Sequence, residues 1–165
     1  MILTKYSELA KIRNGNPGKK IVFCSGTFDL THAGHVLFFE DCKKYGDILF
    51  VAVGNDFNIR KLKATARPLL NENIRIKTVD SFKPVDYCMV DIELHKKGHP
   101  IDVIMPAMKH LKPDIYIVNQ DAFDIAHRES LARKMKARLV ILDRWCPPEF
   151  ENISTTKIIE KIKKS

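Results

Sequence analysis

The sequence predicts an α/β protein with an open parallel sheet of five strands and helices on both faces. Short apolar runs alternate with helix-like segments along the chain, the order that gives parallel strands joined by helical crossovers. The run at 48–53 is continuously apolar, as expected of a strand covered on both faces. A chain of 165 residues, 45% of them hydrophobic, can form one domain with a sizeable core. We therefore predict a single domain over residues 1–165.

Turn and capping signals place the individual elements. Residues 3–13 carry a partial apolar stripe and predict a helix, so 1–18 would form an N-terminal helix and linker. The predicted strands are 20–25, 47–54, 85–90, 115–118 and 139–142. The predicted helices after the first are 33–45, 71–83, 101–111, 124–137 and a last one starting near Ser154. Residues 55–70 are expected to form a basic loop.

The formal net charge of +8 is compatible with nucleic acid, an acidic membrane or a phosphorylated small substrate. Much of the excess lies in the C-terminal tail and in the helix at 124–137, where solvated faces commonly carry such charge. No aromatic residues interleave with these lysines, so we do not expect a platform for single-stranded nucleic acid.

Apolar runs are too short for a membrane span, which needs about 20 residues, and the N-terminal apolar region is too short for a signal peptide. We therefore expect a cytoplasmic protein with no membrane partner. The four cysteines, at 24, 42, 88 and 146, show no metal-ligand spacing. We expect reduced thiols and no zinc.

The segment from Gly26 to His35, Gly-Thr-Phe-Asp-Leu-Thr-His-Ala-Gly-His, carries the strongest functional signal. It joins a predicted strand to a predicted helix, where free N–H groups and the helix dipole favour an anion. His32 and His35 are three residues apart, so both can face the same phosphoryl oxygens. A glycine turn or a lone histidine is common in α/β domains and alone would indicate nothing. The combination predicts a phosphate-binding site.

Three other segments follow predicted strands and should lie at the same edge of the sheet, where ligands of parallel sheets bind. The first contains Lys61, Lys63 and Arg67, with Arg75 on the next helix. The second is 118–121, and the third is 152–157. Ser154 alone would be an ordinary helix N-cap. With two threonines after it, the same helix start offers a second seat for an anion.

Residues 26–35 resemble the first signature of the cytidylyltransferase-like nucleotidyltransferases, the His-x-Gly-His family. Residues 153–158, Ile-Ser-Thr-Thr-Lys-Ile, resemble its second signature. The resemblance covers about residues 20–160 and is closest to glycerol-phosphate cytidylyltransferases and heptose-phosphate nucleotidyltransferases, the latter through Arg67-Pro68 and Arg75. It implies a Rossmann-like fold that transfers a nucleotidyl group from CTP or ATP to a small sugar-phosphate or polyol-phosphate, with release of pyrophosphate.

The resemblance also implies roles for individual positions. The expected catalytic residues are His32, His35 and Lys63, with Lys61 as an alternate for the lysine. The expected nucleotide-binding residues are Gly26, Thr27, Phe28, Gly34, Arg75, Asp121, Ser154, Thr155 and Thr156. Asp29 would orient the turn or approach a Mg²⁺ ion, which is expected because it accompanies triphosphates. A homodimer is also expected from the resemblance.

The sequence departs from the family at three places, one of which, Asn73 in place of a more usual acidic residue near Arg75, is expected to have little effect. Asn119-Gln120 stands where relatives usually have a glycine before the aspartate, and the arginine and glycine expected before Ile153 are absent; Arg144 is a candidate substitute for that arginine. The base and the acceptor therefore stay open. The alternatives are an FAD synthetase-type enzyme that adenylates FMN, a nucleotide-binding regulator without turnover, and a nucleic-acid-binding module.

Overall fold

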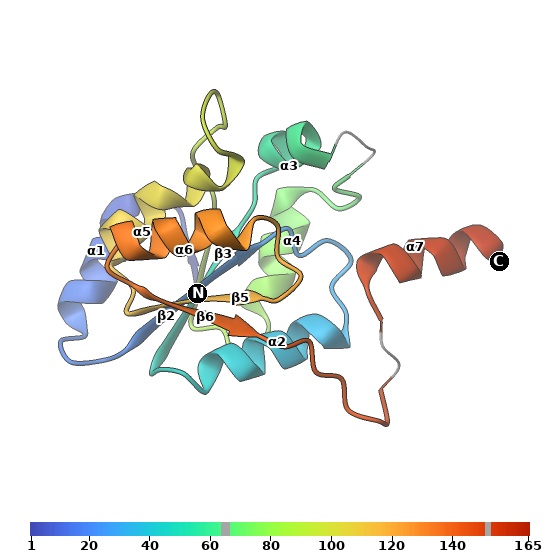
Figure 1. Ribbon diagram of the computed structural model, residues 1–165, viewed down its shortest axis with the longest axis horizontal. Helices are drawn as coiled ribbons and strands as arrows, with labels where there is room; N and C mark the ends of the chain where they lie inside the picture. The colour runs from blue at the N-terminus through green and yellow to red at the C-terminus, as the bar shows by residue number, and fades with distance from the viewer. Residues whose placement is uncertain (64–66, 151–152) are drawn as a thin grey trace.

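The computed structural model describes residues 1–63, 67–150 and 153–165. Its described residues form one parallel sheet of six strands, in the order β1-β4-β3-β2-β5-β6 (Figure 1). The strands are β1 (Ile2–Leu3), β2 (Ile21–Gly26), β3 (Ile48–Val53), β4 (Tyr87–Val90), β5 (Ile115–Asn119) and β6 (Arg138–Leu142). The predicted α/β class and its parallel sheet are confirmed.

The prediction of five strands was wrong, because the sheet has a sixth strand, β1, at its edge. β1 pairs in parallel with β4 through Ile2 and Leu3, and the first helix begins only at Tyr6. The carboxylate of Glu8 accepts hydrogen bonds from the backbone N–H groups of Thr4 and Lys5, so the helix cannot extend back to residue 3. A two-residue strand is too short to show the alternation by which strands are recognised.

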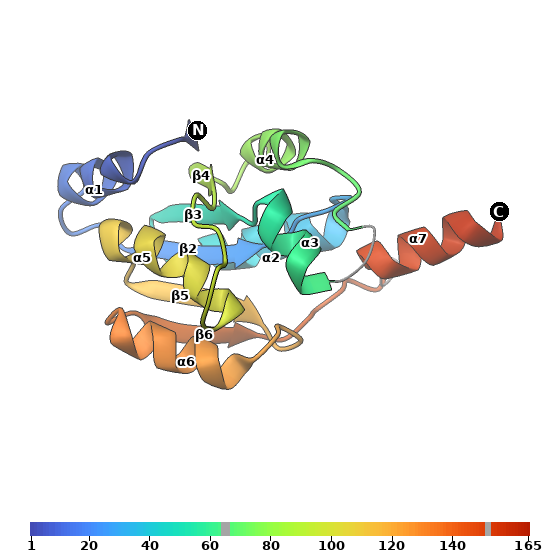
Figure 2. The same ribbon diagram turned by 90° about the horizontal axis from the view of Figure 1, so that it is seen from above.

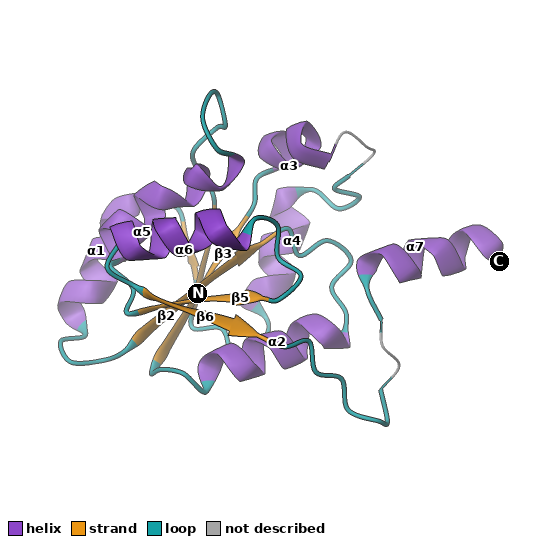
Figure 3. Ribbon diagram, viewed as in Figure 1, coloured by secondary structure: helices purple, strands orange, loops and turns teal. Residues whose placement is uncertain are grey.

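Helices cover both faces of the sheet (Figure 3). The helical elements are α1 (Tyr6–Gly15), α2 (Ala33–Lys43), α3 (Asp56–Lys63), α4 (Glu72–Asp80), the 3₁₀ helix η1 (Pro100–Ile104), α5 (Met105–Leu111), α6 (Ile125–Lys134) and α7 (Thr155–Lys164). α1, α5 and α6 share one apolar cluster with Phe23, Phe50 and Tyr116. α2 and α4 share the opposite cluster with Val22 and Leu49. Alternate residues of each central strand thus face opposite layers.

The prediction of a loop at 55–70 was wrong for the first half of that segment, because Asp56–Lys63 form α3. The side chain of Asn55 accepts a hydrogen bond from the backbone N–H of Asn58 at 2.8 Å, which is an N-cap interaction. Ile59 is buried on the inner side of α3. The helix is short and its other apolar residues, Phe57 and Leu62, are exposed, so its apolar pattern is weak in the sequence.

β2 and β5 are neighbours in the sheet, and the strand order reverses between them. The crossover that follows β2 and the crossover that follows β5 lie on opposite faces of the sheet. The carboxyl ends of two neighbouring strands therefore diverge into loops that run in opposite directions, and this is where open α/β sheets bind ligands. β2 ends at Gly26, the first residue of the predicted signature, and β5 ends at Asn119. The topology thus brings the opening signature beside the segment at 119–121.

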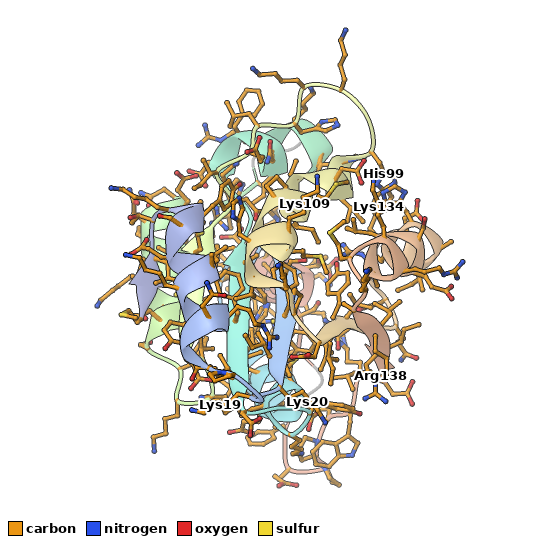
Figure 4. All side chains as sticks on the ribbon, turned by 90° about the vertical axis from the view of Figure 1, so that its left-hand side faces the viewer. Lys19, Lys20, His99, Lys109, Lys134 and Arg138 are labelled. Carbon is orange, nitrogen blue, oxygen red and sulfur yellow. The ribbon has the colours of Figure 1, made fainter. Side chains whose placement is uncertain are left out.

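Several basic residues lie away from that edge. Figure 4 faces the edge where the strands begin and labels Lys19 and Lys20, which precede β2, and Arg138, which starts β6. Lys134 lies in the last turn of α6, a position where a cation interacts favourably with the helix dipole. No described helix is long and apolar enough to cross a bilayer.

Candidate functional site

A cleft of about 980 Å³ opens at the carboxyl ends of β2 and β5. The predicted site residues that line it are Gly26, Thr27, Phe28, Asp29, His32, Gly34, His35, Asp121, Ser154, Thr155 and Thr156. They come from three segments, at 26–35, 121 and 154–156, and the fold assembles them around one space. Arg75 does not line the cleft, and the side chain of Lys63 lies outside the described part of the structure.

The two histidines stand at the start of α2. His32 is its N-cap residue, and its Nδ1 accepts a hydrogen bond from the backbone N–H of Gly34 at 3.1 Å. The Nδ1 of His35 accepts one from the backbone N–H of His32 at 3.4 Å. A neutral imidazole that accepts at Nδ1 carries its proton on Nε2. Each ring therefore keeps one N–H donor for a ligand.

Both imidazoles are held in the neutral form. Burial, then the neighbouring His32 and the cation of Arg144, lowers the pKa of His35 from an ordinary 6.5 to about 4. Burial and Arg144 also lower the pKa of His32. The ring centroids are 4.2 Å apart, too close for two positive charges at neutral pH. The pair thus presents two hydrogen-bond donors that carry no net charge.

The turn before these histidines has a tightly constrained shape. Phe28 has a positive φ of 52°, a conformation that costs energy for a side chain of this size. Its buried ring packs edge-on against His35 at 5.7 Å between centroids and against Phe39. A Cβ on Gly26 would lie 2.8 Å from this ring, so glycine there allows the aromatic ring to fold over the strand end and support His35.

The two predicted signatures touch directly. The hydroxyl of Thr155, in the first turn of α7, donates to the backbone carbonyl of Asp29 at 2.9 Å. Ser154 is the N-cap of α7, and its side chain accepts from the backbone N–H of Lys157 at 3.2 Å. Thr156 lines the same cleft. The N-termini of α2 and α7, each favourable for negative charge, are thereby joined at one site.

Asp29 orients the turn. Its carboxylate is almost completely buried and accepts hydrogen bonds from the backbone N–H groups of Leu69 and Leu70, at 2.9 and 3.0 Å. Arg67 also lies 3.7 Å from it. Both carboxylate oxygens are thus engaged within the protein. Of the two roles expected from sequence, the contacts support the orienting role.

Arg75 corrects the sequence expectation. Its guanidinium is fully buried, with no exposed surface, and it donates to the carbonyls of Thr27, Gly54 and Leu70. It also forms an ion pair with Asp56 at 2.8 Å. These partners occupy the donors that a triphosphate would need. Arg75 therefore holds the nucleotide-binding turn in place from behind, and the expected phosphate contact is not available to it.

The basic residues after β3 divide into different roles. Lys61, the alternate to Lys63, is exposed and donates to the carbonyl of His95 at 3.0 Å. Arg67 lines the cleft. Lys63 is the last residue of α3, and what its side chain contacts lies outside the described residues. Arg67 is thus the cation of this segment that the described structure brings to the cleft.

Two further arginines complete the cleft. Arg128, on α6, donates to the hydroxyl of Tyr116 and to the carbonyl of Phe123, and Arg144, after β6, forms an ion pair with Asp121 at 3.1 Å. Both line the cleft. From the sequence, Arg128 belongs to a helix face expected to be solvated, and Arg144 is only a candidate substitute for the missing arginine. Neither arginine lies in a recognisable motif. The only signal in the sequence for a place at the site is that Arg128 follows the end of β5 and Arg144 follows the end of β6.

The comparisons with known proteins agree with this geometry. A family model described as cytidylyltransferase-like matches residues 23–161. The chain belongs to the cytidylyltransferase-like family. The chain is thus an enzyme of the nucleotidyltransferase type, and its family binds a nucleoside triphosphate and phosphorylated substrates.

Two curated relatives are similar over most of this chain. An FAD synthase from Archaeoglobus profundus is 35% identical over 142 residues, which cover 86% of this chain and 84% of the synthase. The bifunctional protein HldE from Campylobacter jejuni is 33% identical over 145 residues, which cover 88% of this chain. The chain spans only 28% of the length of HldE, so the likeness concerns one part of that protein.

Two solved structures have the same fold. A lipopolysaccharide core biosynthesis protein from Thermoplasma volcanium superposes with a TM-score of 0.59 and 28% identity, over 76% of this chain and 96% of that protein. A pantoate-beta-alanine ligase from Francisella tularensis superposes with a TM-score of 0.65 and 15% identity, over 100% of this chain and 78% of the ligase. At that identity the ligase shows the fold alone.

We predict that Arg75→Gln destabilises the protein by about 3 kcal/mol or more, because it leaves Asp56 and three carbonyls without their donor. Arg60→Gln is the matched control. Arg60 also faces Asp56, at 3.7 Å, but its side chain is 67% exposed, so its loss should cost less than about 1 kcal/mol. Urea unfolding measures both. Equal effects would contradict the structural role of Arg75.

We predict that His35 titrates with a midpoint of about 4 in the folded protein. Because this pKa lies below the ordinary value of 6.5, the unfolded chain takes up the proton first as pH falls. The contribution of His35 to the pH dependence is therefore a loss of stability on going down from about pH 6.5 to pH 4. NMR titration of the imidazole measures the midpoint, with the urea-unfolded chain as reference. Matching midpoints in the two states would refute the neutral, buried assignment.

Proposed function

We propose that the protein transfers the nucleotidyl group of CTP or ATP to the phosphate of a small sugar-phosphate or polyol-phosphate and releases pyrophosphate. The observation that carries this proposal is the hydrogen bond between Thr155 and the carbonyl of Asp29. It brings the N-termini of α2 and α7 together at a cleft that two neutral histidines and three arginines also line. Such a site accommodates several phosphoryl groups of one ligand.

In this proposal an oxygen of the acceptor phosphate attacks the α-phosphorus, and the bond to the pyrophosphate oxygen breaks. The acceptor phosphate is already ionised at neutral pH, so no general base is required. The protein supplies position and charge stabilisation. The Nε2–H groups of His32 and His35 would donate to the oxygens of the transferring group, where negative charge shifts during the reaction. Arg67, Arg128 and Arg144 would balance the charge of the remaining phosphates.

Neutral histidines suit this role better than cationic ones. An imidazolium would bind the substrate triphosphate strongly before reaction, and interactions that are equally strong in substrate and transition state do not raise turnover. The hydrogen bond from a neutral donor strengthens most when negative charge increases on the oxygen that it contacts. The lowered pKa of His35 supports this division of labour between neutral donors near the reacting phosphorus and arginines around it.

We further propose that Mg²⁺ enters with the triphosphate. Among the described residues, no group of three or more potential ligands is arranged for a metal ion, and the Asp29 carboxylate is engaged by backbone N–H groups. Such a donor set fits an ion bound mainly through phosphate oxygens and water. The Asp121 carboxylate lines the cleft and is the group we would assign to the ion's outer contacts. The ion would offset phosphate charge.

The nucleotide base would enter a narrow recess beside the cleft. This recess shares Gly34, Phe38, Asn119 and Arg144 with the cleft, and the exposed Trp145 also lines it. The polar amide of Asn119 could contact the base edge, while the exposed face of Trp145 offers a surface for stacking. Both adenine and cytosine present hydrogen-bonding edges of this type, so both triphosphates belong in the test.

FMN is the second candidate acceptor, which would make the product FAD. The similarity to an FAD synthase over 84% of that protein favours it. So does the apolar side of the cleft, where Leu62 and Phe123 are exposed and Ile101 contributes part of the wall. A flavin ring needs such an apolar surface, whereas a sugar needs hydroxyl partners. The sugar-phosphate proposal rests instead on the similarity to the heptose-phosphate signature at Arg67-Pro68.

The deciding experiment crosses ATP and CTP with sugar-phosphates, polyol-phosphates and FMN, and measures pyrophosphate release and product mass. Release with a sugar-phosphate or polyol-phosphate supports the first proposal, and formation of FAD supports the second. A nucleotide that raises the melting temperature while no acceptor releases pyrophosphate would contradict both. That result would instead favour a nucleotide-binding regulator.

We predict that His35→Ala lowers turnover roughly 100-fold or more, the usual loss when a donor to a developing charge is removed. His35→Gln should retain part of the activity because its amide places an N–H near the position of Nε2. His110→Ala is the control, since His110 stacks on Tyr6 on the opposite side of the molecule and its loss should leave turnover unchanged. Steady-state kinetics with folded variants measures each effect. Full activity of His35→Ala would exclude the assigned role.

A further inference from the structure

A second cavity, of about 460 Å³, lies at the carboxyl ends of β1 and β4. It shares no lining residue with the nucleotide cleft. α3 separates the two spaces, because Phe57 at its start lines this cavity and Leu62 near its end lines the cleft. Figure 2 shows the N-terminal segment beside β4 and α4, the elements that form the rest of the wall. The proposed nucleotidyl transfer uses none of these residues.

A buried carboxylate faces this cavity. Asp91 directly follows β4 and is only 8% exposed, and it is one of the lining residues. Its backbone groups are bonded to Val53 and Asn55. Within residues 1–63, 67–150 and 153–165, no donor or cation is recorded at its carboxylate. Burial raises the pKa of Asp91 to about 7, as expected when a charge lacks a compensating partner.

The remaining wall is mostly apolar, with a second acid and the neutral polar residues Thr4, Asn55 and Asn73. Glu72 lines the cavity too, and none of the lining residues is a lysine, arginine or histidine, although the chain carries a net charge of +8. The apolar lining residues are Ile2, Leu3, Phe57, Ile76, Val90, Ile92 and Leu94. Phosphorylated ligands are disfavoured here, since two carboxylates would repel them. A cation with an apolar body matches both the charge and the surface.

We propose that this cavity binds a small organic amine, whose ammonium group pairs with Asp91 and whose apolar body packs between β4 and α3. The ammonium would supply the missing partner of the carboxylate. The hydrocarbon part would cover Phe57, Ile92 and Leu94, whose side chains are 52%, 46% and 48% exposed. The site is independent of the nucleotide cleft and does not rest on the proposed function.

The test uses benzylamine, with benzyl alcohol as its uncharged counterpart of similar shape, at about pH 8, where the Asp91 carboxyl is ionised. Binding is followed by NMR chemical-shift changes in the ¹⁵N-labelled protein. We expect the amine to bind at least tenfold more tightly than the alcohol, with shifts confined to the residues around Asp91. Equal affinity of the two compounds, no binding, or shifts confined to the nucleotide cleft would each overturn the proposal.

Asp91→Asn then separates charge from shape. We expect the preference for the amine to fall to less than about twofold in this variant, since the polar shape stays while the charge is lost. Asp143→Asn removes the same charge from an exposed residue after β6 and should leave the preference unchanged. Glu72 is unsuitable as a test position, because it also accepts the backbone N–H of Asp56 at 2.8 Å. A preference that survives in Asp91→Asn would contradict the assigned ion pair.

Discussion

The guanidinium of Arg75 ties together four segments that lie behind the cleft. It donates to the end of β3 at Gly54, to the signature turn at Thr27 and to the loop carbonyl at Leu70, and it pairs with Asp56 at the start of α3. A buried cation of this kind is tolerated only because every side of it meets an acceptor. Since the same turn carries Phe28 and leads into His32, the geometry of this end of the cleft depends on this one side chain.

A carboxylate completes the framework from the other side. Asp29 accepts the N–H groups of Leu69 and Leu70, while its own carbonyl accepts the hydroxyl of Thr155. The loop after α3, the signature turn and the start of α7 are therefore fixed relative to one another by groups that are not themselves the reacting ones. Precise placement of donors relative to a phosphoryl group is what such an enzyme needs, because positioning and charge stabilisation supply most of the rate.

The two cavities differ in charge. The cleft is lined by Arg67, Arg128 and Arg144 around two neutral histidines, whereas the second cavity presents Asp91 and Glu72 within apolar walls. The net charge of the chain predicts the charge of neither cavity. Several of the cations, among them Lys20 and Arg138, lie at the opposite edge of the sheet, where the strands begin. The cleft therefore favours anionic ligands, and the second cavity disfavours them.

The sequence by itself determined the parallel α/β fold, the two signatures and the class of reaction, because each of these is encoded in contiguous residues. Apolar runs mark strands locally, and Gly26 to His35 spans the end of a strand, a turn and the start of a helix. The tertiary structure decided what depends on residues far apart in the chain. It buried Arg75, which sequence alone had assigned to phosphate, and it brought Arg128 and Arg144 to the cleft. It also added β1, whose two residues become a strand only through pairing with β4, and it left Asp91 facing a cavity. Burial and pairing are properties of the assembled fold, so no local pattern in the sequence records them.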